Sequence, residues 1–192
     1  MNKADLIKSL CQFVESGNKA SGNELIKHQY PFKKIEYVKR SYSKALMLRV
    51  FMKDGFIDRY SGQKLIFPPV LRILSMSYPE EFPFHPNWKM SECHPAYWDL
   101  LPTIDHIIPI AKGGDNTEEN LVSTSMMRNS AKSNFTLEEL GWQLHSPGKI
   151  ENWDGQVSWF IEIVEKHPEY LNIRYIKEWF VVLKKHIKIT EL

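Results

Sequence analysis

The feature that most constrains this chain is the order of polar residues and turn signals between residues 101 and 134. Asp105-His106 follows the run Leu-Pro-Thr-Ile and precedes Ile-Ile-Pro, and Lys112-Gly113-Gly114-Asp115 is a loop signal. Asn120 lies fourteen residues after His106, and Asn129 lies nine residues after Asn120. β-Branched residues favour strands, and paired glycines favour turns. The pattern therefore predicts a strand over residues 101–110, with Pro109 near its end, and a loop that leads to a second strand.

The residues that follow predict helices with recognisable ends. Residues 121–124 indicate the second strand, and 125–133 a helix whose N-cap is Ser125. Thr136-Leu-Glu-Glu139 has the capping-box pattern and predicts a short helix that stops at Gly141. Two further helices are expected over about 156–166 and 169–188, separated at Pro168.

The chain before residue 101 is less regular. Residues 4–16 have apolar residues at helical spacing, and residues 16–23 (SGNKASGN) have the composition of a linker. A longer helix is expected from Pro31 to about Asp54. Residues 56–100 hold many prolines and aromatics, which predicts packed short elements and ordered loops.

The segment DHIIPIAKGGDNTEENLVSTSMMRNSAKSN resembles the core of the HNH, or ββα-metal, endonuclease family, in the variant whose last position is Asn. The resemblance covers about 30 residues closely. It implies an α+β fold with a ββα-metal nuclease core at 55–145, an N-terminal helical and partly basic segment at 1–54, and a C-terminal helical segment at 146–192. The zinc-binding cysteine pairs of many members are missing, so an apolar core or the flanking helices are expected to brace the fold.

The resemblance also implies roles for four residues. His106 would be the general base, Asp105 and Asn129 the metal ligands, and Asn120 the residue that ties the loop to the backbone near His106. A histidine titrates near neutral pH and can take a proton from water. Regular strand geometry would place Asp105 and His106 on opposite faces, so a kink or the strand end is expected to bring both to one site. A carboxylate and an amide oxygen suit Mg²⁺ or Mn²⁺, completed by water and substrate phosphate.

Basic residues are unevenly distributed. The net charge is only +2, but residues 27–53 carry eight lysines and arginines against one acid, Glu36. This segment is either a solvated helix face or a surface for DNA phosphates. The residues expected to contact DNA are Lys33, Arg40 and Lys44 in this segment and Arg128 and Lys132 on the helix after the second strand.

Composition limits the remaining possibilities. A chain of 192 residues with 43% hydrophobic residues can form one domain with a helical appendage. Cys11 and Cys93 form no CxxC pair, which argues against a disulfide scaffold and a zinc ribbon. His85, Cys93 and His94 fit no zinc template and are interpreted as structural. No apolar stretch reaches the length of a membrane span, so a cytoplasmic location is expected.

The predicted function is metal-dependent hydrolysis of DNA phosphodiester bonds, in restriction, defence or a mobile element. Three alternatives stay open: a DNA-binding module that has the fold without cleavage, a nuclease acting on RNA, and a structural protein without nuclease activity. Because one HNH site cuts one strand, a double-strand break would need two events or a homodimer, for which the long C-terminal helix offers a surface.

Overall fold

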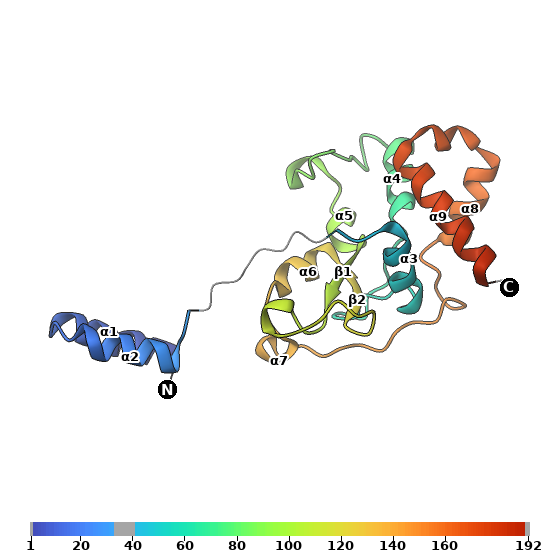
Figure 1. Cartoon of the computed structure of the whole chain (residues 1–192). Helices are drawn as coiled ribbons and strands as arrows, with labels where there is room; N and C mark the ends of the chain where they lie inside the picture. Colours follow the sequence, from blue (N-terminus) through green and yellow to red (C-terminus); the bar gives the residue numbers. More distant parts are fainter. Residues whose placement is uncertain (1, 33–40, 191–192) are drawn as a thin grey trace. The chain divides into compact units, whose positions relative to one another are not determined.

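The chain forms two compact units, Met1–Arg40 and Ser41–Leu192 (Figure 1). The computed structural model describes residues 2–32 and 41–190, the last three by their backbone alone. The functional division expected at 54/55 and 145/146 stays a prediction.

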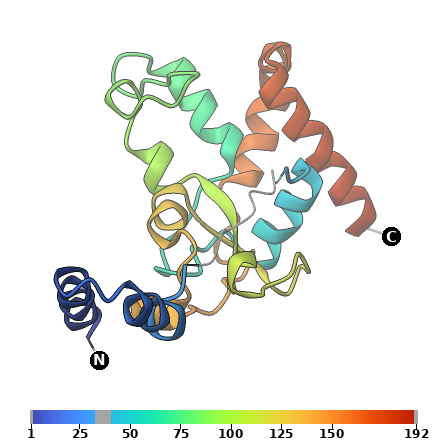
Figure 2. The same ribbon diagram turned by 60° about the vertical axis from the view of Figure 1, so that its left-hand side comes forward.

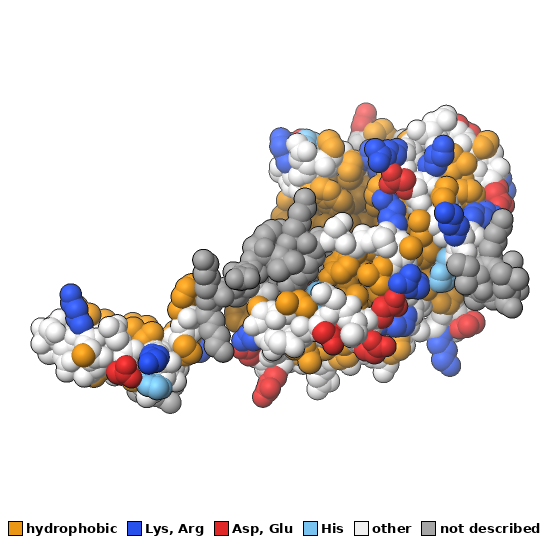
Figure 3. Space-filling model, viewed as in Figure 1, with side chains coloured by type: hydrophobic (Ala, Val, Ile, Leu, Met, Phe, Trp, Pro, Cys, Tyr) orange, Lys and Arg blue, Asp and Glu red, His pale blue; other side chains and the backbone are white. Residues whose placement is uncertain are grey.

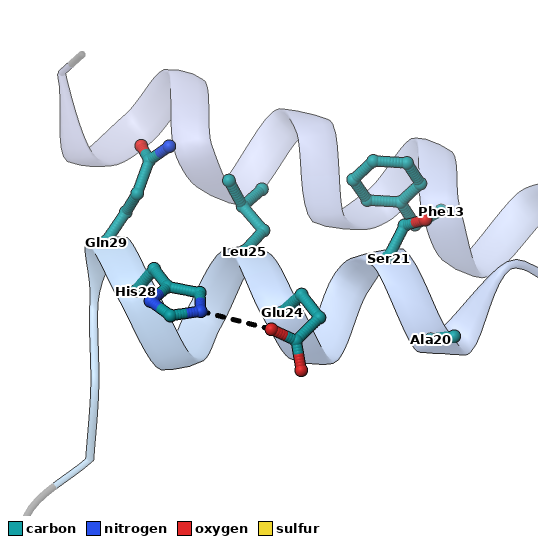
Figure 4. A pocket seen from close by; sticks show the side chains of 7 residues that line it. All are labelled: Phe13, Ala20, Ser21, Glu24, Leu25, His28 and Gln29. Carbon is teal, nitrogen blue, oxygen red and sulfur yellow. Dashed lines mark hydrogen bonds and ion pairs between the residues drawn. The ribbon is translucent and has the colours of Figure 1, made fainter.

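The first unit is a pair of helices, α1 (Lys3–Glu15) and α2 (Lys19–Gln29). Asn2 and Asn18 cap them by accepting hydrogen bonds from the N–H groups of Ala4 and Ser21. In Figure 4, Leu25 points from α2 toward α1. The expectation of a linker over 16–23 is wrong, because α2 begins at Lys19. The glycines and asparagines that suggested a linker include the cap of this helix and a position, Gly22, packed against Phe13.

The second unit begins with α3 (Lys44–Lys53), which the Ser43 hydroxyl caps by accepting from the Leu46 N–H. The helix expected from Pro31 to Asp54 therefore ends as predicted but begins later in the part that the structure describes, because residues 41–43 are not helical. Residues 33–40 of that expected helix lie outside the described residues.

Between residues 56 and 100 the chain forms α4 (Pro68–Ser77), a 3-10 turn η1 (Met90–Glu92) and α5 (Ala96–Asp99). Pro68 and Pro69 occupy the first turn of α4, where their missing N–H groups have no intrahelical partner to lose. The prolines of this region thus begin a ten-residue helix, which is longer than the sequence predicted. Leu71, Cys93 and Tyr97 belong to a small core beneath the aromatic side chains.

The C-terminal residues form α8 (Val157–Lys166), a 3-10 turn η3 (Pro168–Asn172) and α9 (Arg174–Thr190). Both ribbon views show α9 beside α3 (Figures 1 and 2), and the two helices are in contact. Their apolar faces meet α4, α8 and the strands in one core, whose largest members are Phe51, Phe56, Phe67, Phe160 and Trp179. An apolar core with contributions from these helices therefore braces the fold, as the missing cysteine pairs implied.

The strands and helix expected around the motif are present, but the first strand ends at His106 and is shorter than predicted. β1 (Pro102–His106) pairs antiparallel with β2 (Leu121–Ser125), with His106 opposite Leu121. The connection contains a 3-10 turn η2 (Ile110–Lys112). α6 (Met126–Lys132) follows directly and is capped by Ser125, and α7 (Leu137–Leu140) has the capping box and the Gly141 C-cap that the sequence predicted. The architecture is α+β, with a ββα unit at its centre.

The outer edge of β2 is held by two buried carboxylates. Asp54 accepts hydrogen bonds from the N–H and hydroxyl of Ser123, and its other oxygen pairs with Arg59 at 2.6 Å. Asp58 accepts from the Ser125 N–H at 2.9 Å and from the Thr124 hydroxyl at 3.0 Å. These side chains attach the 54–62 segment to the sheet without a third strand.

Within the described part of the chain, no helix is both long and apolar enough for a membrane span.

Candidate active site

Asp105 is held by one of its two carboxylate oxygens. The Tyr60 hydroxyl donates to Oδ2 at 2.8 Å, and the Lys132 ammonium lies 2.8 Å from the same oxygen. Burial, followed by the Asp105 charge, raises the pKa of Tyr60 far above its ordinary value, so the phenol stays protonated as a donor. Among the described residues no hydrogen bond to Oδ1 is formed, and the side chain is 12% exposed. One oxygen is thus fixed while the other is available to a ligand.

Lys132 is a structural member of this site. Its side chain is 0% exposed, and besides Asp105 its ammonium donates to the backbone oxygen of His106 at 2.7 Å. The sequence predicted Lys132 as a contact to the DNA backbone, on the same face of its helix as Arg128. The structure contradicts that placement, because the last turn of α6 directs the side chain under β1 and the charge is neutralised there.

Asn129 shows the same arrangement as Asp105. Its Nδ2 donates to the Thr103 hydroxyl oxygen at 2.9 Å and to the Ile104 backbone oxygen at 3.1 Å. A backbone carbonyl can only accept, so the amide orientation is determined and Oδ1 points away from these two partners. Asn129 and Lys132 are three residues apart and share one face of α6, the face that meets β1.

The residues present fit a hard divalent cation, but only as a sparse site. Asp105 offers one carboxylate oxygen and Asn129 one amide oxygen, which are ligands that Mg²⁺ and Mn²⁺ accept. No group of three or more His, Cys, Asp or Glu residues suited to a metal occurs within residues 2–32 and 41–190. Water and substrate phosphate would have to complete the coordination.

His106 lies at the end of β1, and its contacts differ from those of Asp105. The β1–β2 ladder is regular through His106, so no kink turns the imidazole toward the Asp105 carboxylate, and the two side chains have separate partners. The Nε2 atom is 2.9 Å from Oδ1 of Asn116, and the Tyr42 ring centroid lies 6.4 Å from the imidazole. His106 is only 2% exposed. Access of a substrate to the imidazole therefore requires movement of the groups that cover it.

Asn120 ties the inter-strand loop together. Its Oδ1 accepts from the Ile108 N–H at 2.9 Å, and its Nδ2 donates to the backbone oxygens of Ile108 and Asp115 at 3.0 and 2.9 Å. The attachment point is two residues beyond His106. By holding Asp115, Asn120 also fixes the neighbouring Asn116, which contacts the imidazole. Sequence reasoning proposed this kind of tie but did not identify Asn116.

The residues expected to bind DNA have different surroundings. Arg128 is exposed, and its guanidinium lies 5.2 Å from the centre of the Trp142 ring. Lys44 forms an ion pair with Glu178 at 2.8 Å. Lys33 and Arg40 lie outside the described residues. On the face seen in Figure 3, basic side chains of the second unit are interspersed with acidic and apolar ones.

The histidine and cysteine residues near position 90 have structural partners. His94 stacks on Phe82 with centroids 4.1 Å apart, and the Cys93 sulfur accepts from the His85 N–H at 3.1 Å. Cys93 is buried, and His85 faces Glu92 at 3.4 Å. This agrees with the interpretation that these residues support the local fold.

The segment that contains these residues is similar to a known protein family. Residues 101–137 match the family model of HNH endonucleases, a segment that runs from the start of β1 to α7. No curated protein and no solved structure matched the chain. The ββα unit of this α+β fold is therefore similar to HNH endonucleases, and this similarity indicates nuclease activity.

Proposed function

We propose that this protein is a divalent-metal-dependent endonuclease that hydrolyses phosphodiester bonds of DNA. The observation that carries the proposal is the matched arrangement of Asp105 and Asn129. Each is tied back through one terminal atom, and Asn129 and Lys132, the ion-pair partner of Asp105, lie on the same short helix α6. Mg²⁺ or Mn²⁺ held there would neutralise charge on the phosphate and on the departing 3′ oxygen.

His106 is the proposed general base. With Asn116 oriented as in the structure, Nε2 donates to the amide oxygen, and Nδ1 then carries the lone pair that takes a proton from water. Asn116 and Asn120 position this imidazole through the loop, and neither needs to touch the substrate. The products would carry 5′-phosphate and 3′-hydroxyl ends, as the resemblance implies.

Binding of the DNA backbone is assigned to exposed cations. Arg128 extends from α6, the helix that also carries Asn129, so it can reach a phosphate next to the cleaved bond. Lys33, Arg40 and Lys44 remain proposed contacts on the N-terminal side, with Lys44 needing to exchange Glu178 for a phosphate. A cytoplasmic location, a homodimer for double-strand breaks, and a role in restriction or defence belong to the same proposal.

The test is cleavage of supercoiled plasmid with Mg²⁺ or Mn²⁺, with EDTA as the metal-free control. Replacing His106 by Ala should lower the rate by about a hundredfold or more. His28→Ala is the matched control, because His28 is exposed on α2 and, among the residues that the structure describes, pairs with Glu24 alone. Parallel assays on single-stranded DNA and RNA determine the substrate. Binding of duplex DNA without cleavage by the wild type would instead support the binding-module alternative.

A further inference from the structure

The charge balance around Asp105 has a consequence for metal binding. The carboxylate is the single acidic ligand that the proposed site offers, and its Oδ2 is already in contact with the Lys132 ammonium at 2.8 Å. Lys132 cannot move aside easily, because its side chain is 0% exposed and also donates to the His106 backbone oxygen. The cation therefore meets a pair of side chains whose net charge is zero.

The ion pair between Asp105 and Lys132 uses only Oδ2 of the carboxylate, so Oδ1 stays in place as a candidate metal ligand. Tyr60 and Lys132 both bind Oδ2, and Asn129 is held by its Nδ2, so the two candidate ligand oxygens are fixed before the metal arrives. The geometry of the site is thus preorganised, while its attraction for a divalent cation is weakened by a fixed positive charge nearby.

We infer that Lys132 makes metal binding depend on bound DNA. In the free protein, Asp105 and Asn129 hold Mg²⁺ or Mn²⁺ weakly. When a phosphodiester lies in the site, its negative charge restores the attraction and its oxygen completes the coordination. Thermodynamic linkage requires that the metal then strengthens DNA binding by the same factor. Lys132 is a positioning residue in this scheme, and the inference rests on the proposed function.

The coupling is measured by Mn²⁺ binding, followed as the loss of the free-ion signal in electron paramagnetic resonance. The protein carries His106→Ala so that a short duplex DNA stays intact, and Mn²⁺ bound by the duplex alone is subtracted. We expect the duplex to raise the Mn²⁺ affinity of the protein by about tenfold or more. Equal affinity with and without the duplex would overturn the inference.

Two substitutions test whether the charge of Lys132 causes the dependence of Mn²⁺ binding on DNA. Lys132→Met keeps the length of the buried side chain and should raise the Mn²⁺ affinity of the DNA-free protein by about tenfold, which removes most of the dependence on DNA. Lys112→Gln removes the same charge from an exposed pair with Glu139 and should change neither affinity. If Lys132→Met does not raise the DNA-free affinity while circular dichroism shows native folding, Lys132 is not the cause and the inference fails.

Two further arms separate this inference from the proposed function. If Lys132→Met does not fold, Tyr60→Phe replaces it, because this change removes the other donor to Oδ2 and should also tighten DNA-free Mn²⁺ binding, by a smaller factor. Unchanged or weaker binding in folded Tyr60→Phe would count against the inference. If the wild type cleaves DNA but its Mn²⁺ affinity is the same with and without DNA, the inference is refuted and the proposed function is not. Absence of both Mn²⁺ binding and cleavage would refute the proposed function.

Discussion

The amide oxygen of Asn116 lies 2.9 Å from Nε2 of His106. With the amide oriented in this way, Nε2 donates to the amide oxygen and Nδ1 is left for the proposed role as a base; Asn116 lies within the segment that matches the family model. Asn120 reaches Asp115, the residue before Asn116, so the loop and the imidazole are connected through two asparagines.

The contact predicts different effects for two substitutions of Asn116. Asn116→Ala should lower the cleavage rate by about ten- to a hundredfold, because the ring loses its orientation. Asn116→Asp places a carboxylate against Nε2, which favours the protonated ring. The acidic limb of its pH–rate profile should therefore move to higher pH. An unchanged profile in a folded Asn116→Asp protein would show that Asn116 does not act through His106.

The two adjacent glycines of the loop predict a second contrast. A Cβ on Gly114 would overlap the backbone oxygen of Ile108 and lie 2.8 Å from Nδ2 of Asn120, whereas a Cβ on Gly113 meets nothing within 4 Å. Gly113→Ala therefore carries only the strain of its φ of +91°, about 1 kcal/mol. Gly114→Ala should displace the loop and reduce cleavage much more. Similar activities of the two variants, measured on plasmid, would contradict the proposed role of the loop.

The hydrogen bonds of Asp58 predict that its substitution greatly lowers protein stability, although Asp58 lies outside the proposed active site. Its buried carboxylate accepts from the backbone N–H groups of Tyr60, Ser61 and Ser125 and from the Thr124 hydroxyl. Asp58→Ala leaves these donors unsatisfied and should lower the free energy of unfolding by about 3 kcal/mol or more. Glu162→Gln, on the exposed side of α8, is the control and should stay within about 0.5 kcal/mol of the wild type. Urea denaturation measures both.

The ion pairs of Glu178 with Lys44 and Arg174 predict a contribution to protein stability that depends on pH. The hydrogen bond from Lys44, followed by that from Arg174, lowers the pKa of Glu178 from 4.5 to about 2. A depressed carboxyl pKa means stabilisation that is present above pH 4.5 and is lost as the pH falls toward 2. The melting temperature of Glu178→Gln should therefore lie slightly below that of the wild type at neutral pH, and the difference should shrink with acid or added salt. A difference that grows in acid would contradict this assignment.

The contact between the rings of Tyr42 and His106 predicts that Tyr42 limits access to the imidazole. The tyrosine ring is 6.4 Å from the imidazole, which is only 2% exposed. Tyr42→Ala should speed the modification of His106 by diethyl pyrocarbonate severalfold, as mapped by mass spectrometry. Tyr30→Ala, in the first unit, is the control variant. An unchanged rate at His106 would mean that the loop around Asn116, and not Tyr42, limits access.

The sequence predicted the ββα unit well because its signals are local. Ser125, the Thr136 capping box and Gly141 mark helix ends that the structure confirms. Tertiary contacts account for the errors. The burial of Lys132 depends on Asp105 and on the His106 backbone, which no periodicity reveals. Tyr60 and Asn116 were missed because their roles exist only once the 54–62 segment and the inter-strand loop are folded.

The closed edge of β2 restricts how copies of this protein can associate. Asp54 and Asp58 occupy the outward N–H groups of Ser123 and Ser125, and the Arg59 N–H and the Lys53 ammonium occupy the outward carbonyls of Ser123 and Leu121. A two-stranded sheet would otherwise offer this edge for pairing with a strand from another chain. Strand exchange and edge-to-edge aggregation through the outer edge of β2 are therefore blocked.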